Sequence, residues 1–280
     1  MIAPFRKGRA LLDHIDQITG AEHKLDFWWL GQSGYLVKYK ERFLLFDPYL
    51  SDSLTKKYAR TDKPHVRMSE LVIDPAELDF IEVVTSSHNH TDHLDAETLL
   101  PIMAANPTLQ LIVPEANRTF VVDRLGCNAD YPTGLNAGES VTVKGWTIHG
   151  IPAAHNDLER DELGRFKFMG YVVEVGPFTL YHSGDTLWHE EIIDALEPFQ
   201  IDVAMLPING NKPERRVAGN LDGVEAAKLA KTISAKIVTP CHYDMFTFNT
   251  ADPTYFSTQA ESIDQPYVVL EIGQHWTIEK

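Results

Sequence analysis

The segment from residue 86 to residue 95 reads Ser-Ser-His-Asn-His-Thr-Asp-His-Leu-Asp and holds a cluster of side chains that can bind a metal ion. The members of the cluster are His88, His90, Asp92 and His93, in the spacing His-x-His-x-Asp-His. Neutral imidazoles and carboxylates suit borderline divalent metals, and each ion needs about three to four such ligands. A solvated surface loop rarely gathers so many of these groups, so the segment predicts a metal site.

Three more metal-binding candidates follow later in the chain, namely His155, Asp185 and His242. Each one ends or directly follows an apolar run that is typical of a strand, at 146–154, 178–184 and 237–241, and the first motif follows a similar run at 80–85. Strand ends meet at one edge of a layered α/β fold, where binding sites usually lie. We therefore expect all seven side chains to meet in one site.

The elements that must position these residues follow a regular order. Apolar residues at helical spacing predict a helix over 9–18, and short apolar runs at 27–30, 35–39 and 43–46 predict an antiparallel meander. From about residue 80, predicted strands alternate with helices, and Asp222-x-x-Glu225 is typical of a capping box that opens a helix to about residue 232. The other predicted strands cover 80–85, 110–113, 140–151, 171–175, 178–182, 203–206, 237–239, 267–271 and 276–279, and the other helices cover 96–105, 117–125 and 190–196. Two mixed sheets covered by helices accommodate this order.

The composition narrows the classes of partner. The chain has 25 Lys and Arg against 40 Asp and Glu, a net charge of −15, which disfavours a nucleic-acid substrate because phosphates need a basic surface. Two cysteines are too few for a disulfide framework. No secretory signal and no membrane-spanning apolar run is present, so we expect a cytoplasmic protein. A homo-oligomer is left open.

Beyond the motifs themselves, the chain resembles the metallo-β-lactamase superfamily, and more closely its ascorbate-6-phosphate lactonase group. The resemblance rests on the His-x-His-x-Asp-His motif, and it extends from about residue 27 to residue 254. The matching stretches are Trp28-Trp-Leu-Gly, Ile73-Asp-Pro, Tyr181-His-Ser-Gly-Asp, Ala235-Lys-Ile-Val-Thr-Pro-Cys-His-Tyr-Asp and Ala251-Asp-Pro. The segment Ser-His-Asn-His also resembles the phospholipase D-type members of the superfamily.

This resemblance implies a fold and a set of ligands. The fold would be an αββα sandwich of two mixed sheets flanked by helices, with residues 1–280 forming one hydrolase domain and residues 1–26 an N-terminal helical extension. Carried over by position, His88, His90 and His155 would hold one ion, Asp92, His93 and His242 would hold a second, and Asp185 would bridge the two. The ascorbate lactonase has an acidic residue at the position of His155 and uses manganese, whereas a histidine completes a zinc-type set. Zn²⁺ and Mn²⁺ therefore both remain candidates.

The leading functional hypothesis is hydrolysis of a lactone or ester of a small anionic metabolite, with or without a phosphate group. A water activated by the metal would attack, and Asp92 or Asp185 would handle the proton. One alternative is hydrolysis of a phosphodiester, as in the phospholipase D-like members. The other is a non-hydrolytic di-iron or metal-sensing module, although iron-binding relatives usually replace a motif histidine with a carboxylate.

Candidate substrate contacts have a weaker basis than the metal ligands. Arg215 and Arg216 lie in a loop after a predicted strand and could hold an anion, although exposed arginines are common in any loop. Gln32 lies in a strand-to-strand turn and could face the pocket or serve only the turn. Asp47 could support the site from behind. We expect structural roles for His149, His182 and Cys241.

Overall fold

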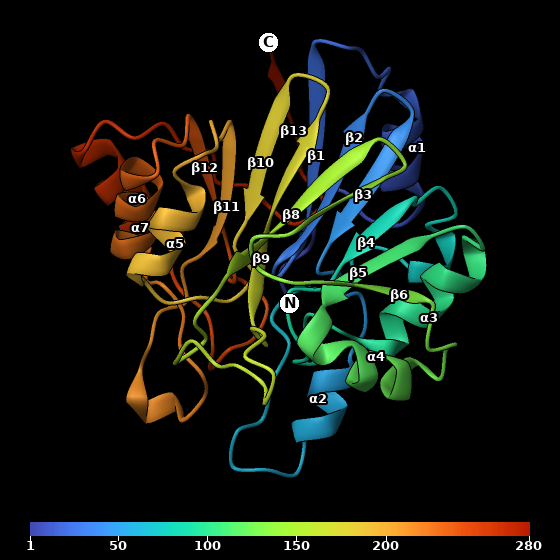
Figure 1. Ribbon diagram of the computed structural model, residues 1–280, viewed down its shortest axis with the longest axis horizontal. Coiled ribbons are helices and arrows are strands. Elements are labelled where there is room, and N and C mark those ends of the chain that lie inside the picture. Colours follow the sequence, from blue (N-terminus) through green and yellow to red (C-terminus); the bar gives the residue numbers. More distant parts are fainter.

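Two mixed β-sheets form the centre of the molecule (Figure 1). The computed structural model describes residues 1–280. The first sheet has the strand order β13-β1-β2-β3-β4-β5-β6, with β13 (His275–Glu279), β1 (Lys24–Gly31), β2 (Gly34–Tyr39), β3 (Arg42–Phe46), β4 (Val83–Thr85), β5 (Gln110–Pro114) and β6 (Pro132–Leu135). The second sheet has the order β12-β11-β10-β9-β8-β7, with β12 (Ile237–Cys241), β11 (Val203–Pro207), β10 (Phe178–His182), β9 (Met169–Val175), β8 (Trp146–Pro152) and β7 (Ser140–Val143).

The two sheets have similar topologies. In the first sheet, β13, β1, β2 and β3 pair antiparallel, and β3, β4, β5 and β6 pair parallel. In the second sheet, β7, β8, β9 and β10 pair antiparallel, and β10, β11 and β12 pair parallel. Strands β2 and β11 are buried along their whole length, as expected for strands that are covered on both faces.

Helices cover the outer faces of both sheets. Figure 1 shows α5 (Glu190–Leu196), α6 (Gly223–Thr232) and α7 (Pro253–Ser262) at the left beside β11 and β12, with α3 (Ala96–Ala105) and α4 (Arg118–Leu125) at the right beside β4 to β6. The remaining helices are α1 (Arg9–Gln17), the short α2 (Ser53–Tyr58), and three 3₁₀ turns, η1 (Pro75–Glu77), η2 (Glu115–Asn117) and η3 (Pro213–Arg215). The layers therefore run helix, sheet, sheet, helix, which confirms the predicted αββα sandwich. No helix is both long and apolar enough to span a bilayer.

One hydrophobic cluster of 68 buried residues fills the interior and runs from Leu11 in α1 to Ile278 in β13. Because the cluster has members in both sheets and in most of the helices, burial of apolar surface holds the layers together. Its largest side chains include Trp28, Trp29 and Trp146. The capping box predicted at α6 is present: Asp222 accepts hydrogen bonds from the Val224 and Glu225 amides, and Glu225 accepts one from the Asp222 amide.

Several predicted elements need correction. The strand predicted over 140–151 is two strands, β7 and β8, because Lys144 and Gly145 both adopt positive φ and turn the chain. The strand predicted over 267–271 is wrong, since only an isolated bridge between Tyr267 and Val238 forms there. Helices α2 and α7 and strand β6 were not predicted. The start of α7 did carry a signal, because Asp252 caps the helix and Pro253 occupies its first turn.

The turn after β10, at the edge of the sheets where the candidate ligands lie, depends on a glycine. Gly184 has a φ of 59°, and a Cβ there would lie 2.4 Å from the Cβ of Ser87 and 2.9 Å from the carbonyl oxygen of Met169. An alanine would therefore add both backbone strain and a steric clash. This turn directly precedes Asp185.

We expect Gly184→Ala to reduce the free energy of unfolding by about 3 kcal/mol, because strain and overpacking each cost about 1–3 kcal/mol. Gly164→Ala is the matched control: Gly164 also has a positive φ of 78°, but nothing lies within 4 Å of its Cβ position. Urea unfolding of both variants measures the difference. Equal loss in the two variants would mean that the close approach to Ser87 has no energetic weight.

Candidate metal centre

All seven predicted ligands lie just beyond strand ends. The segment that carries His88, His90, Asp92 and His93 follows β4, while the other three residues follow strands of the second sheet. His155 comes after β8, Asp185 after β10 and His242 after β12. The structure brings these residues together, as the strand-end argument predicted, and most of them are buried.

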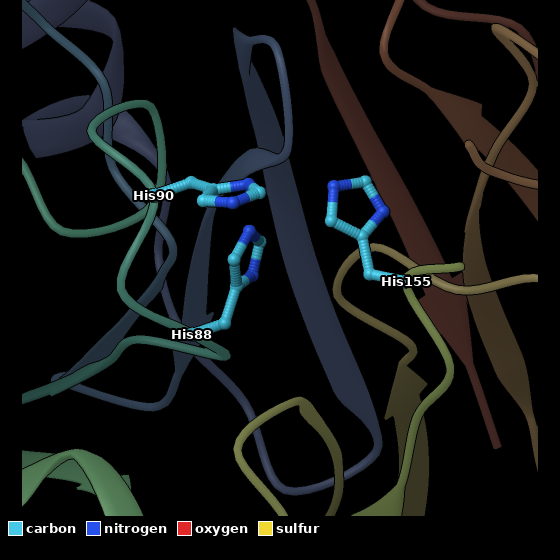
Figure 2. A group of neighbouring side chains, drawn as sticks. All are labelled: His88, His90 and His155. Atoms are coloured by element: carbon cyan, nitrogen blue, oxygen red, sulfur yellow. The ribbon is translucent and has the colours of Figure 1, made fainter. Parts of the chain in front are cut away.

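The first group of potential ligands contains only imidazoles. One ligand atom from each of His88, His90 and His155 lies within 4.8 Å of the others. Figure 2 shows the three rings turned toward a common space, His88 and His90 from one segment and His155 from the opposite side. His155 Nδ1 is 2.8 Å from the Gly219 carbonyl oxygen, so Nδ1 carries a proton and Nε2 is free to bind a metal.

The second group combines Asp92, His93 and His242, whose ligand atoms also lie within 4.8 Å of one another. Asp185 lies between the two groups. Its Oδ2 atom is 3.3 Å from Nε2 of His93 and 3.3 Å from Nε2 of His242. The same oxygen is 3.6 Å from Nε2 of His155 in the first group. A carboxylate in this position can serve both groups.

Buried polar atoms without partners test whether a metal fits here. His88 Nε2, His93 Nε2 and Asp185 Oδ1 are buried and form no hydrogen bond. Such atoms are costly in a folded protein unless water or an ion satisfies them. All three belong to residues of the predicted site, and imidazole nitrogens with carboxylate oxygens are ligands for zinc-type ions. The residues present therefore fit a pair of divalent cations.

The electrostatics of the site also favour bound cations. Burial lowers the pKa of His88 well below its usual range and that of His90 to about 4, so both rings are neutral near pH 7. Burial would also lower the pKa of His93, but the carboxylates of Asp185 and Asp92 outweigh it and raise that pKa well above its usual range. Burial would raise the pKa of Asp185, yet the surrounding histidines hold it well below its usual range. A cation between these carboxylates is thus strongly favoured.

Asp47, which directly follows β3, contacts the candidate ligand His93 on the side of the ring that carries Nδ1. Its Oδ2 atom is 2.7 Å from Nδ1 of His93, and its carboxylate also accepts hydrogen bonds from the amide and hydroxyl of Ser87. Asp47, His88 and His93 also lie close enough to suggest a third ligand group. Because the Asp47 oxygens are already engaged, we assign it the role of orienting His93.

Gln32 is buried behind the ligands and does not line the cavity described below. Its Nε2 atom donates to Asp92 Oδ2 at 2.7 Å and lies 3.1 Å from Nε2 of His242. The backbone amide of His242 in turn donates to the Gln32 carbonyl oxygen at 3.0 Å. Both residues adopt positive φ, 50° for Gln32 and 68° for His242, a strained conformation that is concentrated at functional sites. The geometry suits a positioning residue.

A cavity of about 450 Å³ opens over the two ligand groups. His90, Asp92, His155, Asp185 and His242 contribute to its lining. The two loop arginines differ in their placement. Arg216 lines the cavity and pairs with Asp62 at 2.6 Å. Arg215 does not line it and instead donates to the carbonyl oxygens of Asn209 and Thr250.

The lining also includes basic residues that sequence reasoning missed: Lys57, Lys63, His65 and Arg124. They come from α2, from the segment after it and from α4. No local pattern marked them, because the packing of distant segments brings them to the site. The residues expected to be structural have protein partners: His149 contacts Glu174, His182 contacts the Ser33 carbonyl oxygen, and Cys241 is buried beside Ser33.

Comparison with known proteins agrees with this geometry. The sequence matches a family model described as "Beta-lactamase superfamily domain" over residues 26–242, a span that includes all seven candidate ligands. A UPF0173 metal-dependent hydrolase of Methanosarcina mazei is 26% identical over 254 residues, which cover 89% of this chain and 97% of that protein.

Two solved structures illustrate the similarity in fold. Igni18, a metallo hydrolase from Ignicoccus hospitalis, superposes with a TM-score of 0.67 at 22% identity, over 92% of this chain and 99% of that one. An isothiocyanate hydrolase from Delia radicum gut bacteria superposes with a TM-score of 0.71 at 18% identity, over 91% of this chain and 100% of that one.

We expect Asp47→Asn to weaken metal binding by about 10- to 100-fold, because an amide orients the His93 ring less firmly than a carboxylate does. Competition with a chromogenic chelator measures the affinity. Asp252→Asn is the control, since Asp252 caps α7 and asparagine caps helices equally well. Unchanged affinity in Asp47→Asn would contradict the supporting role.

Proposed function

The chain belongs to the beta-lactamase superfamily, and we propose that it is a metal-dependent hydrolase that cleaves a lactone or carboxylic ester of a small anionic metabolite. The observation that carries this proposal is the pair of ligand groups, joined by Asp185, at the base of a cavity of about 450 Å³. The name of the Methanosarcina mazei relative, a metal-dependent hydrolase, supports the same class of activity. The likeness to the ascorbate-6-phosphate lactonase group is the reason for choosing a lactone or ester.

In this proposal, His88, His90 and His155 would hold one cation, Asp92, His93 and His242 would hold the other, and Asp185 would contribute to both. Divalent ions at such a site act as Lewis acids, which makes water more acidic and polarises a scissile carbonyl. Five imidazoles with two carboxylates suit Zn²⁺ well, and the carboxylates also accept Mn²⁺. We propose one of these two metals.

The chain's own residues position and polarise the reactants. Gln32 fixes the Asp92 carboxylate, which remains partly exposed to the cavity and can accept a proton there. Asp185 Oδ1 has no hydrogen-bond partner and is the second candidate for proton transfer. We also propose that residues 1–280 act as one domain, in keeping with a hydrophobic cluster that extends from α1 to β13.

Cationic side chains around the cavity support an anionic substrate. Lys57, Lys63, Arg124 and Arg216 line it, whereas its only acidic lining residues, Asp92 and Asp185, are proposed ligands. Lys57 bonds to the Thr91 hydroxyl, and Lys63 bonds to the Arg216 carbonyl oxygen. Neither lysine has a carboxylate partner, although the whole chain carries a net charge of −15. A local excess of positive charge attracts and holds anions.

The same cations would also suit a phosphodiester, which keeps that hydrolysis as the second candidate. Parallel assays with p-nitrophenyl acetate and bis(p-nitrophenyl) phosphate separate the two reactions. Preference for the phosphodiester would replace the lactone or ester hypothesis but leave the metal site intact.

We expect His90→Ala to lose at least one equivalent of bound metal and nearly all turnover, because the first group would retain only two imidazoles. Elemental analysis and the ester assay measure both effects. His149→Ala serves as the control, since His149 lies on β8 and contacts Glu174. Normal turnover in His90→Ala would rule out the proposed mechanism.

We expect Lys57→Gln to raise KM about tenfold for mono-p-nitrophenyl succinate, an anionic ester, and to leave KM for neutral p-nitrophenyl acetate unchanged. The matched control is Lys56→Gln. Lys56 is the neighbouring residue on α2, but it does not line the cavity and pairs with Glu97 at 2.7 Å. Equal effects of the two substitutions, or of one substitution on both esters, would argue against an anion-binding role.

A further inference from the structure

One histidine in the cavity belongs to neither ligand group. His65 lies on the segment after α2 and lines the cavity together with His90, Asp92 and His242. The other histidines and the two aspartates of the lining are proposed ligands, and its lysine and arginine side chains are cations at neutral pH. His65 is therefore the one imidazole in the cavity that is available for something other than holding metal.

Aromatic packing fixes the orientation of the His65 ring. Tyr58 stacks on it with 4.3 Å between ring centroids, and Phe248 and Phe246 contact it edge-on at 4.5 Å and 5.2 Å. The adjacent backbone is also fixed, because Thr247 donates to the Val66 carbonyl oxygen and Met68 donates to that of Met245. These bonds tie the segment that carries His65 to the segment that follows His242.

The hydrogen bonding of His65 determines where its proton lies. Nδ1 is 2.9 Å from the Lys63 carbonyl oxygen, which can only accept, so Nδ1 carries the hydrogen in the neutral ring. Nε2 has no partner and retains a free lone pair. Burial lowers the pKa of His65 below its usual range. The Lys63 carbonyl and Asp92 raise this pKa, but by less than burial lowers it, and the Lys57 and Lys63 ammonium groups lower it further. The ring is therefore neutral near pH 7 and can accept a proton at Nε2.

Hydrolysis of an ester or lactone needs such a group. As the bond between water oxygen and carbonyl carbon forms, water gives up a proton, and as the bond to the leaving oxygen breaks, that oxygen must gain one. An alkoxide is a poor leaving group unless it is protonated as it departs, whereas p-nitrophenolate leaves without a proton. A neutral imidazole can take up the first proton and deliver it to the leaving oxygen, and it returns to its starting state.

We propose that His65, rather than Asp92 or Asp185, is this proton carrier: Nε2 accepts the proton that the attacking water releases and donates it to the alkoxide of the leaving group. The proposal rests on the hydrolase function proposed above. It adds a catalytic residue that neither the metal-binding motif nor the strand ends revealed, and it assigns the aromatic residues Tyr58, Phe246 and Phe248 the task of orienting that residue.

The test is a leaving-group series with the metal-loaded enzyme. Acetate esters of p-nitrophenol, trifluoroethanol and ethanol are hydrolysed by the wild type, by His65→Gln and by His149→Gln, a matched histidine variant outside the cavity. We expect His65→Gln to lose about 100-fold in kcat on the ethyl ester and less than a few-fold on the p-nitrophenyl ester. KM, metal content and the melting temperature should stay unchanged, and His149→Gln should match the wild type.

A second measurement does not depend on turnover. The ¹⁵N chemical shifts of the His65 ring, assigned with His65→Gln, should report a proton on Nδ1 and a bare Nε2 at pH 7.5. A proton on Nε2, or an equal loss of kcat across the whole ester series, would overturn the proposal. Hydrolysis of the ethyl ester by His65→Gln at the wild-type rate would also overturn it. The same holds if the wild type hydrolyses the p-nitrophenyl ester but neither of the other two esters. If the wild type hydrolyses no ester at all, the proposed function itself fails.

Discussion

The site depends on one electrostatic constraint: buried carboxylates and imidazoles converge where water is largely excluded. Three carboxylates, those of Asp47, Asp92 and Asp185, lie within 4.0 Å of the ring nitrogens of His93. Removing such groups from water costs far more than the contacts among them return, unless positive charge is placed between them. The same preference for positive charge raises the pKa of His93, so that its ring binds an additional proton. A divalent cation would meet the same requirement more completely, with release of that proton.

The buried cluster of carboxylates and imidazoles requires a rigid scaffold. Each ligand follows a strand that is buried in one of two sheets, so the backbone on which it is mounted cannot move without opening the core. The strained backbone at Gln32, Asp47 and His242 is held by that rigidity, since positive φ at a residue other than glycine is costly on its own. The energy of apolar burial thus sustains a site that would be unfavourable in isolation.

The cavity is built differently from the metal centre. Its walls come from α2, the following segment, α4 and the loop around Arg216, which are connections rather than sheet strands. In many proteins a rigid scaffold positions the loops, and residues on those loops bind the ligand. In this chain these segments contribute positive charge and aromatic side chains to the cavity, together with one histidine that belongs to neither ligand group.

The sequence by itself identified the candidate metal ligands and the layered fold. The spacing of His88, His90, Asp92 and His93 is local, and the apolar runs before His155, Asp185 and His242 are local as well, so both could be recognised without coordinates. Tertiary structure alone decided what surrounds them. It buried Gln32 against Asp92, turned Arg215 away from the cavity, and brought Lys57, Lys63 and His65 to its rim. These placements depend on contacts between segments far apart in the chain, such as that between Lys63 and Arg216, for which neither periodicity nor motif spacing carries a signal.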